Sequence, residues 1–188
     1  RVNSVVAYDG NDSFTITSGN INQIAAGGGT NKFIVKGGWV GSIQGYSGND
    51  TVTLSGDGQV NTLLLGDGVN KVKTGSQWVE HIGTGIGNDR ITLGTGGAGS
   101  VASGDGNDVI RTGAGWVDSI TTGGGNDTVT LAKGGTGVTR LGSGDDRVVV
   151  LAQDPANGLI LSAGQGIDTL DLGKFSKGVV ITLNNLGA

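Results

Sequence analysis

One short turn recurs nine times along the chain, at intervals of about nineteen residues. It follows the pattern Gly-x-Gly-Asn-Asp, as in Gly104-Asp105-Gly106-Asn107-Asp108, and alternating apolar residues come after it. The last residue of the turn, position 0 of each coil, is Asp12, Asn31, Asp50, Asn70, Asp89, Asp108, Asp127, Asp146 or Asp168. A period this short is typical of a solenoid, in which each coil buries its apolar residues only against its neighbours.

Two apolar patterns in each coil predict two strands. Positions +2 and +4 are aliphatic or aromatic in sixteen of eighteen cases, the exceptions being Thr74 and Thr112. This period of two indicates a strand with one buried face. A second apolar pair follows later in the coil, as in Val79 with Ile82, and predicts a second strand on the opposite wall. We therefore expect an all-β, parallel two-sheet β-solenoid of about nine 19-residue coils, without helices.

The predicted module spans residues 1–188. Its regular coils cover about 9–153, and an irregular last coil with a C-terminal cap covers 154–188, where Pro155 and a short insertion interrupt the period. Because the chain begins at Arg1 without an initiator, we expect it to be part of a larger protein. The formal net charge of −4 suggests no basic face for nucleic acid. No apolar run approaches the roughly 20 residues that span a bilayer, so we expect no membrane insertion.

The chemistry of the repeated turn points to calcium. Glycine stands at position −2 in all nine coils and at position −4 in seven, which predicts a backbone folded to turn carbonyl oxygens inward beside the position 0 carboxylate. Calcium binds six to eight such oxygens. The predicted ligands are the carboxylates of Asp12, Asp50, Asp89, Asp108, Asp127, Asp146 and Asp168, with carbonyls of Gly85, Gly87, Gly104, Gly106, Gly123, Gly125, Gly142 and Gly144. The ions would form one column along one edge of the rod.

A purely structural role for the same residues is the alternative. Asp and Asn side chains cap turns by accepting hydrogen bonds from nearby backbone amides. Stacked carboxylates about 5 Å apart would repel without a counter-ion, however, which favours calcium. Asn31 and Asn70 each remove one charge, so the strongest sites are expected between Asp89 and Asp146.

These turns resemble the RTX, or haemolysin-type, calcium-binding repeats, whose nonapeptide is G-G-x-G-x-D-x-U-x. The matching segments are Gly104 to Ile110, Gly123 to Val129, Gly142 to Val148 and Gly164 to Leu170. The first glycine of the family pair, our position −5, is replaced by Ala26, Leu65, Thr84, Ser103, Thr122, Leu141 or Ala163, and the motif fills one turn per coil. The pattern is more similar to the 19-residue-coil, calcium-dependent solenoids of large ice-binding bacterial adhesins. That resemblance implies one calcium ion per coil, a secreted, surface-held parent protein and type I secretion.

Two outward surfaces suggest alternative functions. An Asn ladder at Asn11, Asn49, Asn88, Asn107 and Asn126 resembles one of the two ladders of ice-binding coils, but the Thr expected at position −3 is absent from every coil. Trp39, Trp78 and Trp116 recur about every 38 residues. These rings either shield the corner where the second strand begins or form a half-exposed row that stacks on sugar rings.

We therefore expect a calcium-binding, RTX-type β-solenoid (β-roll) that folds on calcium binding and serves as a structural or adhesive module of a secreted bacterial surface protein. The alternatives are an ice-binding module and a carbohydrate-binding accessory module of a secreted polyuronate-active enzyme. Enzymatic activity is not expected, because every carboxylate of note belongs to the repeat and no nucleophile or zinc motif is found.

Overall fold

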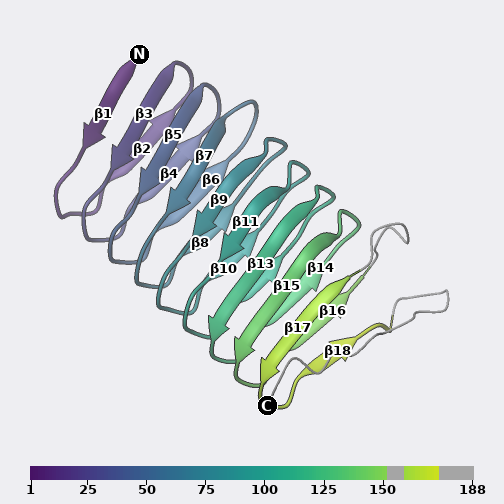
Figure 1. Cartoon of the computed structure of the whole chain (residues 1–188). Helices are drawn as coiled ribbons and strands as arrows, with labels where there is room; N and C mark the ends of the chain where they lie inside the picture. Colours follow the sequence, from purple (N-terminus) through teal and green to yellow (C-terminus); the bar gives the residue numbers. More distant parts are fainter. Residues whose placement is uncertain (152–158, 174–188) are drawn as a thin grey trace.

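The computed structural model describes residues 1–151 and 159–173, and in these ranges the chain forms eighteen strands and no helix, hence none that could cross a membrane. The strands make two nine-stranded sheets (Figure 1). Sheet A contains β1 (Val2–Val6), β3 (Asn20–Ala25), β5 (Trp39–Gln44), β7 (Gln59–Leu64), β9 (Val79–Gly83), β11 (Ala98–Ala102), β13 (Val117–Gly124), β15 (Thr136–Ser143) and β17 (Ile160–Gln165). Sheet B contains β2 (Ser13–Ile16), β4 (Lys32–Val35), β6 (Thr51–Leu54), β8 (Lys71–Lys73), β10 (Arg90–Thr92), β12 (Val109–Arg111), β14 (Thr128–Leu131), β16 (Arg147–Val150) and β18 (Thr169–Asp171).

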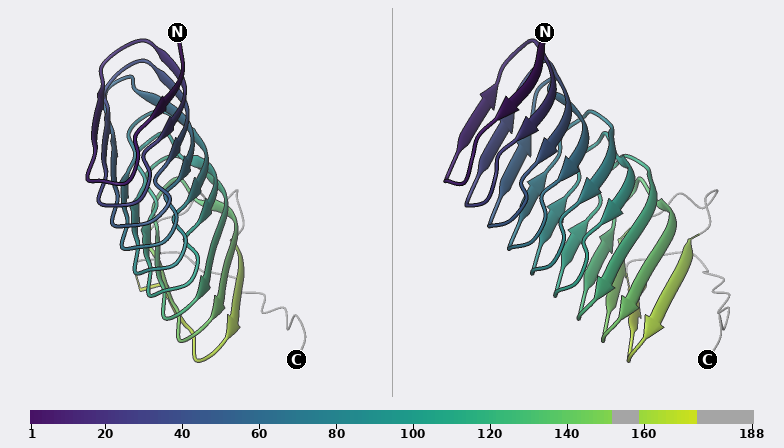
Figure 2. Two further views of the ribbon diagram at one scale, coloured as in Figure 1. Left: turned by 90° about the vertical axis from the view of Figure 1, so that its left-hand side faces the viewer. Right: turned by 60° about the vertical axis from the view of Figure 1, so that its left-hand side comes forward.

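Every strand pairs in parallel with the equivalent strand of the next coil. In sheet B, Ile91 lies beside Val72 on one side and Ile110 on the other, each 19 residues away. In sheet A, Val101 likewise lies between Ile82 and Ile120. The coils stack as successive rungs of a rod (Figure 2). The predicted fold class, a parallel two-sheet β-solenoid with a 19-residue coil, is confirmed.

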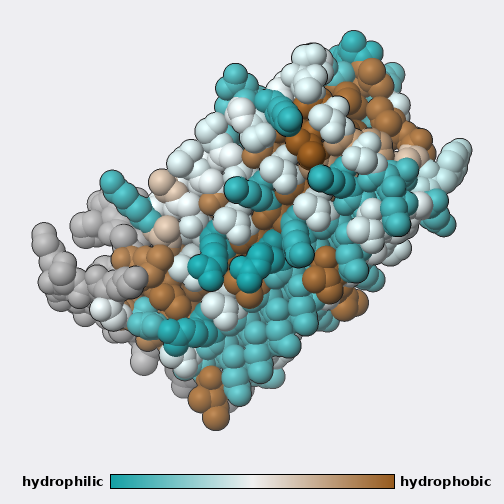
Figure 3. All heavy atoms as spheres, turned by 180° about the vertical axis from the view of Figure 1, so that it is seen from behind, coloured by the Kyte–Doolittle hydropathy of each residue, from teal (hydrophilic) through white to brown (hydrophobic). Residues whose placement is uncertain are grey.

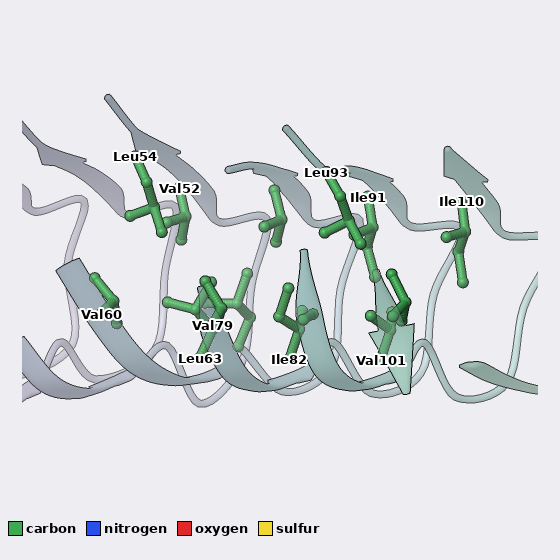
Figure 4. Close-up of a cluster of buried hydrophobic side chains, with 14 of the residues drawn as sticks. Val52, Leu54, Val60, Leu63, Val79, Ile82, Ile91, Leu93, Val101 and Ile110 are labelled. Carbon is green, nitrogen blue, oxygen red and sulfur yellow. The ribbon is translucent and has the colours of Figure 1, made fainter. Parts of the chain in front are cut away.

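The core lies between the two sheets and repeats with the coil. Positions +2 and +4 of sheet B, such as Ile91 and Leu93, face the apolar pair of sheet A, such as Val79 and Ile82 (Figure 4). The pair in sheet A is spaced by three residues, so each of these strands turns two consecutive residues outward between its two buried ones. Near the N-terminal end, the rings of Phe14 and Phe33 stack with centroids 5.1 Å apart.

The two threonines at position +4 are buried and have a structural explanation. The Thr74 hydroxyl accepts the backbone N–H of Gly94 at 3.0 Å, and the Thr112 hydroxyl accepts that of Ala132 at 2.8 Å. Each threonine therefore pairs an amide in the second turn that an aliphatic residue would leave without this acceptor.

The last described coil departs from the regular spacing as the sequence predicts. Gly142 of β15 pairs with Gly164 of β17, 22 residues away. The insertion around Asp154 to Gly158 and the predicted cap strand Val179 to Leu183 lie outside the described residues.

Candidate functional site

The repeated turn adopts a conformation that requires glycine at two places. In the eight coils from Asn31 to Asp168, positions −4 and −2 have positive φ, as in Gly85 (83°) and Gly87 (143°). A Cβ added at Gly104 would overlap the carbonyl oxygen of Gly85 in the preceding coil, so the backbones of adjacent turns touch. Tyr46 occupies position −4 of its coil with φ 69°, the one described non-glycine residue with positive φ. These turns therefore pack their carbonyl groups closely along one edge of the rod.

The position 0 side chains form a buried column along this edge. Seven consecutive members are no more than 2 % exposed: Asn31, Asp50, Asn70, Asp89, Asp108, Asp127 and Asp146. Asp12 and Asp168, at the two ends, are half-buried. Sequence reasoning thus identified the column and its inward direction, and the structure places five carboxylates and two amides inside it.

One oxygen of each buried side chain has a structural role. Oδ1 accepts the backbone N–H of the position 0 residue in the preceding coil. Asp108 accepts from Asp89 at 2.8 Å and Asp127 from Asp108 at 2.8 Å. The capping role considered as an alternative to calcium is therefore present, but it accounts for only one of the two carboxylate oxygens.

The second oxygen, Oδ2, has no hydrogen-bond partner in five coils: Asp50, Asp89, Asp108, Asp127 and Asp146. The asparagine coils show what surrounds this atom. Nδ2 of Asn70 donates to the carbonyls of Gly66 at 2.9 Å, Gly68 at 3.2 Å and Thr84 at 2.9 Å. The same position is therefore ringed by carbonyl oxygens at positions −4 and −2 of its own coil and at position −5 of the next coil.

In the aspartate coils an acceptor stands where asparagine supplies a donor. Oδ2 then faces carbonyl oxygens in a site removed from water, an arrangement that requires a cation or a proton between them. Burial raises the pKa of Asp89 to about 6, against the opposing effects of the nearby Thr84 hydroxyl and of the hydrogen bond from the Asn70 amide. Burial likewise raises the pKa of Asp127 to about 6, and the neighbouring Asp108 and Asp146 carboxylates add to the rise. Without a cation, burial in the column therefore disfavours the charged form of these carboxylates.

Position −5 distinguishes the individual sites. Its side chain is buried beside the position 0 residue, and in three consecutive coils it carries a hydroxyl, at Thr84, Ser103 and Thr122. Each of these hydroxyls donates to the position −5 carbonyl of the next coil, as Thr84 does to Ser103 at 3.0 Å. Leu141 fills the same place beside Asp146. The environment richest in oxygen therefore surrounds Asp89, Asp108 and Asp127, a narrower range than the sequence predicted.

These residues fit calcium. By equivalence with Asn70, each of the three aspartate coils offers Oδ2, three carbonyls and one hydroxyl, and water would complete the six to eight oxygens that calcium takes. Among the described residues, no three His, Cys, Asp or Glu side chains gather as a metal cluster. The site uses one carboxylate per coil, and most of its oxygens come from the backbone.

Two further side-chain ladders lie on the outside of the same turn. Oδ1 of Asn88 accepts the backbone N–H of Asn107 in the next coil at 2.7 Å, and Asn11, Asn49, Asn107 and Asn126 bond in the same way. Position −3 repeats this pattern through Asp9, Asp67 and Asp105, a structural ladder that the sequence reasoning missed although aspartate recurs there. Asp145, at position −1, continues the Asn ladder by accepting the backbone N–H of Ile167 at 2.8 Å. The Asn ladder therefore joins coils with its oxygens, and the side chains remain exposed.

The three tryptophans lie on the outer face of sheet A. Each indole N–H donates to a polar side chain: Trp39 to Asn61 at 3.1 Å, Trp78 to Glu80 at 3.2 Å and Trp116 to Asp118 at 2.7 Å. The rings of Trp78 and Trp116 extend over glycines of the next coil, Gly99 and Gly137. Trp78 is 36 % exposed and the other two are half-buried. The rings thus cover backbone on the outside of the sheet and form a half-exposed row.

Charge is segregated between the turns and sheet B. Six exposed cations point outward from sheet B, and we call them the basic strip: Lys32, Lys71, Lys73, Arg90, Arg111 and Arg147. Figure 3 shows long hydrophilic side chains along this face, with paler residues between them. The net charge of −4 gives no sign of this basic face, because the acidic residues are concentrated in turns while half of the chain's twelve cations lie on one sheet. The prediction that the chain does not bind nucleic acid stays a prediction.

Comparisons with protein-family models, with curated proteins and with solved structures find no match to this chain.

Proposed function

We propose that this chain is a calcium-binding, RTX-type β-solenoid that folds on calcium binding and acts as a structural or adhesive module of a secreted bacterial surface protein. One observation carries the calcium proposal. Five buried carboxylate oxygens have no partner, at the position where Asn70 places an amide nitrogen among three carbonyl oxygens. A calcium ion would neutralise each carboxylate and bind the carbonyls around it.

Binding would be coupled to folding. The oxygens that surround Oδ2 come from two adjacent coils, so no complete site exists in the unfolded chain. The binding free energy then becomes folding free energy, and the chain would stay unfolded where calcium is scarce and fold where it is abundant. This behaviour suits a protein exported unfolded into a calcium-rich exterior, which is our reason for proposing an extracellular location.

The test is a calorimetric calcium titration of the chelator-treated chain, with far-ultraviolet circular dichroism recorded at each step. We expect several sites to fill together with a gain of β signal. The triple variant D89N/D108N/D127N should lose the calcium dependence of its folding. The matched control D9N/D67N/D105N removes the same charge from the exposed position −3 ladder and should keep it. Equal calcium responses in the two triple variants would refute the proposed site.

The outward surfaces bear on the two alternative functions. For ice binding, the Asn ladder uses its oxygens between coils, and the basic strip interrupts the threonines of sheet B. These observations favour a structural or adhesive role over ice binding, which an ice-recrystallisation assay would test. For carbohydrate binding, the half-exposed tryptophan row supports stacking on sugars. Glu80 and Asp118 beside two of the rings would repel a polyuronate, so this row suits an uncharged glycan.

A further inference from the structure

The basic strip holds cations that the protein itself does not neutralise. Arg147 pairs with Asp171, the one outward-facing carboxylate in the described strands of sheet B. Within residues 1–151 and 159–173, the other five cations of the strip make no ion pair. These five positive charges are therefore open to an external partner.

Several cations of the basic strip also lie close enough to repel one another. Lys71 and Arg90 are direct neighbours in adjacent coils, with backbones about 4.8 Å apart. Lys73 projects from the same strand as Lys71, about 6.6 Å further along it. Like charges placed side by side on one sheet face are destabilising. A destabilising arrangement of this kind is expected where a surface has a function.

The residues between the cations indicate which kind of partner would fit this face. Serine and threonine fill most of the remaining outward positions, at Ser13, Thr15, Thr51, Thr53, Thr92, Thr128, Thr130 and Thr169. Lys73 and Arg111 lie in the same outward column two coils apart, an interval of about 9.6 Å along the axis of the rod. The face is thus a straight track of spaced cations and hydroxyl groups.

We propose that the basic strip binds an extended acidic polysaccharide that lies along the axis of the rod. Its sulfate or carboxylate groups would contact the Lys and Arg side chains, and its hydroxyls would bond the threonines between them. Platforms for single-stranded nucleic acid add aromatic side chains for base stacking, and the described strands of sheet B turn none outward. A protein partner would need an apolar centre, and here Ile34, Val109 and Val149 are scattered singly. The proposal does not rest on calcium binding.

The test uses the folded chain, verified by circular dichroism, and dextran sulfate as the probe, with uncharged dextran as the control polymer. The variant K71T/K73T copies onto β8 the outward residues Thr51 and Thr53 of β6, so the sheet should keep its fold. The variant K133Q/R140Q removes two exposed charges that lie outside sheet B. Affinities are measured by biolayer interferometry at several salt concentrations.

We expect the unmodified chain to bind dextran sulfate and not dextran, with an affinity that falls as salt rises. The variant K71T/K73T should bind about tenfold more weakly and with a shallower salt dependence, because it forms two fewer ionic contacts. The variant K133Q/R140Q should match the unmodified chain. Equal losses in both variants, or equal binding of dextran, would overturn the proposal. Tighter strip-dependent binding of single-stranded DNA than of dextran sulfate would assign the surface to nucleic acid instead.

Discussion

Replacing Asp89 by Asn tests directly whether the buried column needs a positive partner. The substitution keeps the shape of the side chain and its Oδ1, which accepts the Asn70 N–H at 2.6 Å. It also exchanges the unpartnered Oδ2 for an N–H₂ group, which Asn70 shows can donate to three carbonyls. In the absence of calcium we therefore expect the variant to be more stable than the unmodified chain.

The magnitude follows from the pKa of the Asp89 carboxyl. Burial raises this pKa from 3.8 to about 6, which corresponds to roughly 3 kcal/mol against the ionised form at pH 7. Because the pKa is raised, the penalty is fully present above about pH 6 and disappears as the pH falls towards 3.8. Asp89→Asn should remove this penalty and raise the melting temperature at pH 7 by roughly 6 to 12 °C, with a smaller gain at pH 4.5.

The assay is thermal unfolding followed by circular dichroism, in chelator and in calcium, at both pH values. In calcium the order should reverse, because the variant has lost a charged ligand. Asp67→Asn is the control, since it removes the same charge from an exposed side chain whose Oδ1 accepts the Ile86 N–H at 3.1 Å. A calcium-free Asp89→Asn protein that melts at or below the temperature of the unmodified chain at pH 7 would show that the reasoning about Oδ2 is wrong.

Three other substitutions test the packing of the coils, each by chemical denaturation. Gly106→Ala should lower the free energy of unfolding by more than 3 kcal/mol, because φ is 138° and the new Cβ would strike the preceding turn. The control Gly19→Ala, where the new Cβ would meet open space, should lower it by only about 1 to 2 kcal/mol. Tyr46→Gly should raise stability by up to about 1 kcal/mol, because it relieves a left-handed φ of 69°; a loss would show that the ring contributes more than the strain costs. Thr112→Val should lower the free energy of unfolding by about 1 to 3 kcal/mol by leaving the half-buried Ala132 amide unpaired, and no loss would mean that this amide finds another acceptor.

Much of the fold could be predicted from the sequence because the same coil pattern recurs nine times. The alternation at positions such as Ile91 and Leu93 indicates a strand in any single coil, and its recurrence every nineteen residues fixes the parallel stacking of the strands. Glycine at positions −4 and −2 likewise indicated an inward-facing turn. The burial of Asp89, Asp108 and Asp127 agrees with that prediction.

Other features depend on contacts between coils that no single repeat reveals. The pattern cannot say that Asp108 caps the preceding coil while Asn107 caps the following one. Nor does it show that Leu141 is buried at the position where the three preceding coils carry hydroxyls, because position −5 reads only as a departure from a motif. Net charge also concealed the basic strip, since a sum over the chain carries no information about where the charges lie.

The parallel pairing of each coil with only its neighbours has a mechanical consequence. A force applied along the axis of the rod would act on the joints between coils in series, and the weakest joint would open first. Each coil that peels away exchanges about 4.8 Å of rod for 19 residues of extended chain, or about 60 Å. A short rod of this design would therefore lengthen more than tenfold in discrete steps, and would dissipate a sudden load before its ends part.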